Sequence, residues 1–68
     1  MTPTEILLEA LKRAETRADA ASVYADGIGQ REAIDWPSFN RIVMDRFGGE
    51  SGLRRIKRVA WKIVESRP

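Results

Sequence analysis

The stretch from Ser51 to Ser66, SGLRRIKRVAWKIVES, constrains the fold most, because its apolar and basic residues recur with the period of an α-helix. On a helix of roughly 100° per residue, one arc carries the apolar side chains Leu53, Ile56, Val59, Ala60, Ile63 and Val64. The opposite arc carries Arg54, Arg55, Arg58 and Lys62. Trp61 falls at the border between the two arcs. We therefore expect a helix that packs on its own domain through one face and exposes a basic face.

The composition excludes several classes of protein. With 43% hydrophobic and 32% charged residues, the 68-residue chain is typical of a folded, highly charged domain. It has no cysteine and no histidine, so it lacks the commonest metal ligands and the commonest acid/base group at neutral pH. The remaining carboxylates, serines and lysines show no spacing that pairs a nucleophile with a base. We expect no enzymatic activity, no cofactor and no metal.

Nothing in the sequence predicts a membrane protein. No apolar run approaches the roughly 18 residues that a membrane span needs. The first residues, MTPTEILLEA, lack the basic region of a signal peptide. We expect a soluble, cytoplasmic protein, and we rank binding of the basic helix to an anionic membrane surface below the hypotheses that follow.

A first helix is predicted over about residues 3–25. Thr2 as N-cap, Pro3 at the first helical position and Glu5 as the reciprocal partner form a capping box. The apolar positions that follow alternate in steps of four and three: Leu7, Leu11, Ala14, Ala18, Ala21 and Ala25. This seam predicts one continuous helix that packs closely where its residues are alanines.

Glycines predict where that helix ends. Asp26 and Gly27, followed by Gly29, place the end near residue 24 or 25 and a loop over residues 26–34. Ile28 and Ile34 are expected to anchor this loop in the core. The loop lacks the glycines and the preceding strand of a phosphate-binding fingerprint, so turn formation is its expected role.

A second helix is predicted over about residues 36–47. Asp35 is its expected N-cap, Pro37 lies in its first turn, and Ile34 with Phe39 can form a hydrophobic staple. Its apolar face carries Trp36, Phe39, Ile42, Val43 and Phe47. Gly48 and Gly49 predict a turn over residues 48–50, after which Glu50 or Ser51 caps a third helix over about residues 51–66.

These signals predict one all-α domain over residues 1–68. Three helices with one longer loop and one tight glycine turn correspond to a small three-helix bundle. The short turn between the second and third helices predicts a helix-turn-helix-like arrangement of that pair.

Positive charge is concentrated in residues 50–68, where six Lys and Arg face two Glu, although the net charge of the whole chain is only +2. Arg54 and Arg55 fall in the first turn of the expected helix, where they oppose its dipole. Arg54, Arg58 and Lys62 repeat at intervals of four, and such like-charge neighbours cost about 0.2–0.5 kcal/mol per pair. An anionic partner would explain this pattern. The alternatives are a solvated face or one neutralised by acids earlier in the chain, such as Glu15 or Asp19.

A nucleic acid is the first candidate partner. A helix-turn-helix would place the third helix in the major groove of double-stranded DNA, as in small regulatory domains. The candidate nucleic-acid-binding residues are Arg54, Arg55, Lys57, Arg58, Trp61 and Lys62. The three arginines would meet base edges and the two lysines would reach phosphates. RNA stays open as a partner, because a tryptophan can stack on a base.

A small protein-interaction module or phage-type inhibitor is the alternative. Arg, Trp, Tyr and Met are enriched at protein interfaces, so Trp61, Met44 and Tyr24 are candidates, with the arginine row against an acidic protein surface. A homodimer is expected if the protein binds DNA with sequence specificity. The seam from Ala14 to Ala25 or the edge of Trp61 would then join the two copies.

Overall fold

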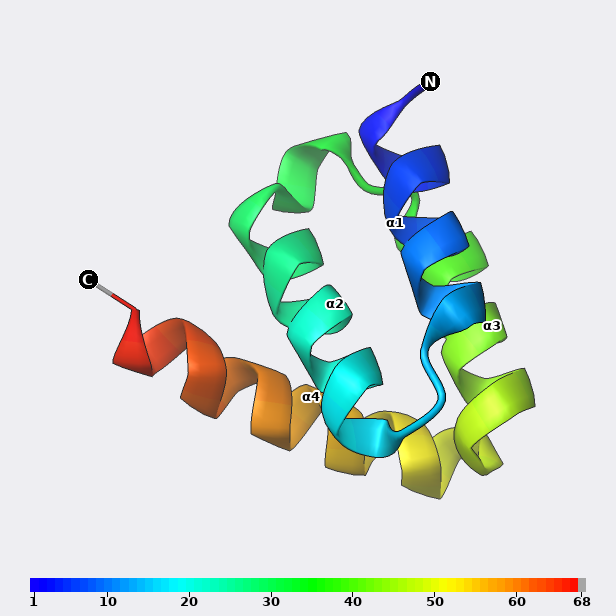
Figure 1. Cartoon of the computed structure of the whole chain (residues 1–68), viewed down its shortest axis with the longest axis vertical. Helices are drawn as coiled ribbons and strands as arrows, with labels where there is room; N and C mark the ends of the chain where they lie inside the picture. Colours follow the sequence, from blue (N-terminus) through cyan, green and yellow to red (C-terminus); the bar gives the residue numbers. More distant parts are fainter. Residues whose placement is uncertain (68) are drawn as a thin grey trace.

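The structure, a computed structural model, describes residues 1–67 and is all-α, as predicted. Its helices are α1 (Pro3–Arg13), α2 (Arg17–Gly29), the short 3-10 helix η1 (Arg31–Ala33), α3 (Trp36–Phe47) and α4 (Gly49–Ser66). In Figure 1, α4 lies across the lower ends of α2 and α3. α1 packs against α2 and α3. Within residues 1–67, no helix combines the length and the hydropathy needed to cross a bilayer.

The prediction of one helix over residues 3–25 is wrong, and the described residues therefore contain four α-helices where three were expected. α1 ends at Arg13, and Ala14 has extended backbone with ψ 125°. Thr16 then caps α2 by accepting a hydrogen bond from the backbone N–H of Asp19. The cap of the second helix outweighs the continuity of the alanine seam, because it satisfies one of the donors that every new helix leaves open.

Arg46 of α3 stabilises this break. Its guanidinium donates hydrogen bonds to the carbonyl oxygens of Leu11 at 3.0 Å and Ala14 at 3.1 Å, and also to that of Lys12. These carbonyls lie at the C-terminal end of α1, where backbone acceptors run out of donors within the helix. The Leu11 carbonyl also accepts a hydrogen bond from the backbone N–H of Ala14. A cation at a helix C-terminus also interacts favourably with the helix dipole. One side chain from α3 thus holds the end of α1.

α2 does not end near residue 25 but continues through Asp26 and Gly27 to Gly29, so the loop predicted over residues 26–34 shrinks to η1 and its flanks. Gly27 is buried, and a methyl group at this position would lie 3.4 Å from the Trp36 ring and 3.7 Å from Leu7. Packing against these side chains outweighs the low helix propensity of glycine. Ile28 and Ile34 are buried as predicted.

The bounds of α3 coincide with the predicted range. Asp35 caps it by accepting a hydrogen bond from the backbone N–H of Ser38. The helix ends at Gly48, which has φ +100° and lies in the left-handed region that glycine favours.

α4 starts earlier than predicted. It begins at Gly49, directly after Gly48, so the connection is one residue rather than residues 48–50. Neither Glu50 nor Ser51 caps it, and no side chain accepts a hydrogen bond at its N-terminus. The connection between α3 and α4 can be this short because Gly52 has no side chain. A methyl group at this position would lie 1.7 Å from the carbonyl oxygen of Phe47.

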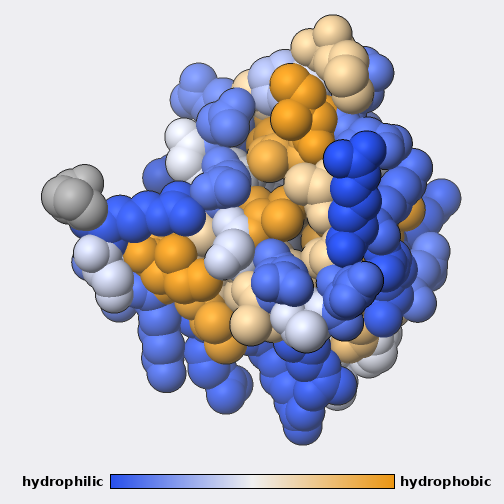
Figure 2. Space-filling view, viewed as in Figure 1, coloured by the Kyte–Doolittle hydropathy of each residue, from blue (hydrophilic) through white to orange (hydrophobic). Residues whose placement is uncertain are grey.

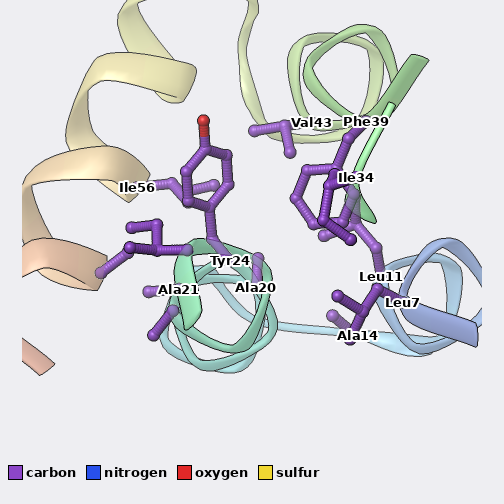
Figure 3. Packing of buried hydrophobic residues seen from close by; sticks show 13 residues of the cluster. Leu7, Leu11, Ala14, Ala20, Ala21, Tyr24, Ile34, Phe39, Val43 and Ile56 are labelled. Atoms are coloured by element: carbon purple, nitrogen blue, oxygen red, sulfur yellow. The ribbon is translucent and has the colours of Figure 1, made fainter. Parts of the chain in front are cut away.

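The core contains residues of every α-helix: Leu7, Leu11, Ala14, Ala20, Ala21, Tyr24, Ala25, Ile28, Ile34, Phe39, Val43, Ile56 and Ala60. In Figure 3, Tyr24 lies between Ile56 of α4 on one side and Phe39 and Val43 of α3 on the other. Two residues expected on buried faces are exposed. Ala18, in the first turn of α2, is exposed although Ala21 and Ala25 of the same seam are buried, and Val59 is 45% exposed at the edge of α4.

Replacing Gly52 should test the junction between α3 and α4. We expect Gly52→Ala to lower the free energy of unfolding by about 3 kcal/mol, because the added methyl group meets backbone that cannot rotate away. Gly29→Ala is the matched control, because nothing lies within 4 Å of a methyl group there. Urea unfolding of both variants measures the difference. Equal stability of the two would contradict the tight junction.

Removing the Arg46 side chain should test the break between α1 and α2. We expect Arg46→Ala to cost about 2 kcal/mol of unfolding free energy, because carbonyl groups lose charge-assisted hydrogen bonds. Arg41→Ala removes the same charge from an exposed position on the same helix and should change stability by less than about 0.5 kcal/mol. Thermal unfolding of both proteins measures the effect, and a similar loss in both would show that Arg46 acts only through its charge.

Candidate nucleic-acid interface

α4 presents the predicted basic residues to solvent. Its buried positions are Gly52, Ile56 and Ala60, which share one side of the helix. The six candidate residues are all exposed: Arg54, Arg55, Lys57, Arg58, Trp61 and Lys62. Figure 2 shows hydrophilic side chains projecting from the lower edge of the molecule, where α4 runs in Figure 1.

The exposed cations form three neighbouring regions around α4. Arg54, Arg58 and Lys62 follow one another at one turn's spacing on the side away from the core, and we call them the basic strip. Arg55 lies toward α2, and Lys57 lies on the other side, next to Trp61. The residues therefore share one helix, but not one flat face.

No carboxylate of the described residues 1–67 forms an ion pair with the basic strip. Among residues 1–67, the ion pairs join Lys12 to Glu9 at 3.8 Å and Arg67 to Asp26 at 3.0 Å. Glu15 and Asp19 were the acidic residues that could be expected to neutralise α4, but within residues 1–67 neither forms an ion pair with it. The α2 side chain beside Arg55 and Arg58 is itself a cation, Arg17.

One part of the electrostatic expectation is wrong. Because α4 begins at Gly49, Arg54 and Arg55 lie in its second turn rather than its first, and the first turn carries Glu50. The dipole penalty falls off within the first turn, so it no longer distinguishes these arginines. The like-charge spacing of the basic strip remains.

A hollow of about 400 Å³ lies between the start of α2 and the middle of α4. Its lining residues are Arg17, Ala18, Arg55, Ile56, Arg58 and Val59. Three of these residues are apolar and the other three are arginines. We call this region the arginine-rimmed hollow.

A second pocket, of about 390 Å³, lies on the opposite side of α4. It is lined by Tyr24, Ile28, Arg31, Trp36, Asn40, Lys57 and Trp61, and we call it the aromatic pocket. Trp36 is fixed there by a 3.0 Å hydrogen bond from its indole N–H to the carbonyl of Arg31. Its ring centroid is 5.3 Å from that of Tyr24 and 5.6 Å from that of Phe39.

Tyr24 orients the amide at the back of the aromatic pocket. Its hydroxyl donates a 2.8 Å hydrogen bond to Oδ1 of Asn40. Burial raises the pKa of Tyr24 from its ordinary value of 10 to about 12, so the hydroxyl stays protonated, and able to donate, well above neutral pH. With Oδ1 engaged as acceptor, the Nδ2 group of Asn40 is left to donate to a ligand.

Sequence reasoning missed three residues of these pockets: Arg17, Arg31 and Asn40. A signal existed for Asn40, because it lies four residues after Trp36 and hence on the same side of α3. Nothing local pointed to the two arginines, because they reach α4 only through the folding of α2 and η1.

The three residues proposed for a protein interface differ in their exposure to solvent. Trp61 is 46% exposed, whereas Tyr24 is only 2% exposed and cannot provide a protruding contact. Met44 is half-buried. The alanine seam expected as a dimer surface is largely used inside the molecule, because Ala14, Ala21 and Ala25 are buried.

Comparison with known proteins adds no family to this geometry. No family model matches the chain, and no curated protein sequence and no solved structure is significantly similar to it.

Proposed function

We propose that this protein binds nucleic acid, with double-stranded DNA as the main ligand, through the exposed basic residues of α4. The observation that carries the proposal is the basic strip without carboxylate partners in residues 1–67. Arginine side chains suit phosphates as ligands, because the guanidinium can donate two parallel hydrogen bonds to one phosphate, as it also can to a carboxylate. The protein would act without catalysis, as a small regulatory DNA-binding domain.

The arrangement of α3 and α4 supports this reading. α4 lies across the end of α3 (Figure 1). Its basic strip is exposed, on the side of the helix away from its buried residues. Arg54 and Arg58 lie in the second and third turns of α4, and Lys62 follows one turn later, about 6 Å along the axis. In a helix-turn-helix-like complex, the arginines would meet base edges or phosphates and Lys62 would meet the backbone.

One departure from the common motif limits the analogy. The usual turn between the two helices has about three or four residues, whereas Gly48 alone connects α3 to α4. We therefore propose a helix-turn-helix-like pair only in the sense that α3 supports α4 and α4 contacts the ligand.

The arginine-rimmed hollow favours a second candidate function, a protein-interaction module or inhibitor. Its three apolar side chains and its three guanidinium groups would suit an acidic protein segment with one or two apolar side chains. This candidate predicts a stoichiometric complex with one protein and no affinity for DNA.

The first test measures binding to a labelled, random-sequence duplex at two salt concentrations. We expect affinity in the micromolar range or tighter at low salt, weakening as salt rises, because bound phosphates release counterions. In the double variant Arg54→Ala/Arg58→Ala, the slope of log affinity against log salt concentration should become shallower by the amount that corresponds to the loss of about two phosphate contacts. Fluorescence anisotropy measures both quantities.

A matched control removes the same charge elsewhere. Lys12→Ala/Arg13→Ala changes two exposed basic residues at the end of α1, outside the basic strip. It should keep most of the wild-type affinity and slope. Absence of binding at low salt by the folded wild type, or equal loss in the two double variants, would overturn the proposal.

A further inference from the structure

We propose that the aromatic pocket binds one unpaired nucleobase of a nucleic-acid strand whose phosphates contact α4. The inference rests on the proposed nucleic-acid binding, because the base would reach the pocket on a strand held by the basic strip. It adds a preference for DNA that carries an unpaired nucleotide over fully paired duplex.

Two indole rings on different helices provide stacking surfaces. Trp61 of α4 is 46% exposed, and Trp36 of α3 is half-buried; both line the pocket. Trp36 is held by its hydrogen bond to the Arg31 carbonyl and by its contacts with Tyr24 and Phe39. A base that stacks on it would therefore not have to order this side chain first. Stacking on aromatic side chains tolerates every base, because every base has a π-face.

Asn40 supplies a polar group that suits a base edge. Since its Oδ1 accepts from Tyr24, its Nδ2 can donate to a carbonyl oxygen or ring nitrogen of a base. Unpaired bases expose these acceptors on their Watson–Crick edge, whereas paired bases do not. The combination of fixed aromatic rings and an oriented amide favours a planar, polar ligand over an aliphatic one.

The charges around the pocket are positive. Lys57 and Arg31 line it, and neither forms an ion pair among residues 1–67. Lys57 lies one turn before Trp61 on α4, and Trp61 in turn borders the basic strip. A strand crossing from the strip to the pocket would thus keep cations beside its phosphates. An acidic peptide would satisfy the cations but would leave the two indole faces without planar partners.

The experiment compares three labelled DNAs: a blunt duplex, the same duplex with a short overhang of unpaired thymidines, and the same overhang with abasic sugars. We expect the thymidine overhang to bind roughly 5- to 100-fold more tightly than the abasic one, which has the same charge but no base to stack. Tryptophan fluorescence should be quenched by the thymidine overhang only.

Variants assign the preference to the pocket. Trp61→Ala should abolish the difference between the thymidine and abasic overhangs, and Trp61→Phe should restore part of it, because a smaller ring still stacks. Asn40→Leu should also reduce it. Val59→Ala, on the other side of α4 and also exposed, should leave it unchanged. Circular dichroism confirms that each variant folds.

The outcomes separate the two proposals. Equal binding of all three DNAs by the wild type, or a preference that survives in Trp61→Ala, would overturn the base pocket while leaving α4 as a phosphate-binding helix. Binding of none of the three at low salt would overturn both proposals.

Discussion

Burial of Ile56 and Ala60 decides which side of α4 faces solvent. Ile56 is 1% exposed, and Ala60 is fully buried against a core built largely by α2 and α3. Burying a side chain of the size of Ile56 contributes about 1.5–3 kcal/mol, whereas each like-charge neighbour in the basic strip costs about 0.2–0.5 kcal/mol. The hydrophobic term is larger, so the rotation of α4 follows its apolar residues and the cations are turned outward together. The exposure of the basic strip therefore depends on the burial of Ile56 being worth more than the repulsion between the cations costs.

Small residues allow α4 to make that contact at short range. Ala20, Ala21 and Ala25 of α2 are fully buried, and α4 contributes Ala60 and Gly52 on its own buried side. Such positions let helices approach closely, at the cost of little apolar area per residue. Tyr24 of α2 and Trp36 of α3 instead bring two large rings together, with their centroids 5.3 Å apart, and both line the aromatic pocket. The aromatic pocket therefore forms where close packing gives way to large rings.

The sequence predicted those features that depend on neighbouring residues. The caps at Thr2 and Asp35, the bounds of α3 and the left-handed Gly48 are set by short-range hydrogen bonds and glycine geometry, and all are present. The break after Arg13 was also locally encoded, since Thr16 and Asp19 have the spacing of a helix N-cap and its third residue. The prediction of one continuous helix is wrong there because the alanine seam runs across this capping pair without interruption. The helical course through Gly27 could not be predicted, because the side chains that pack on it come from other helices: Leu7 from α1, and Trp36 and Phe39 from α3.

In the candidate site, too, features set by neighbouring residues could be predicted, whereas features set by packing between helices could not. Exposure of the basic strip could be deduced from the period of α4 alone, because four-residue spacing keeps side chains on one side of any helix. The aromatic pocket could not, because Tyr24, Trp36 and Trp61 belong to three helices whose relative placement the sequence pattern leaves open. Once α4 is docked by Ile56, the tryptophan at its border must lie over the gap between α2 and α3, and Lys57 must lie beside it. The packing of Ile56 thus places the Trp61 ring between the basic strip and the aromatic pocket. A nucleic-acid strand could contact the strip with its phosphates and the pocket with an unpaired base.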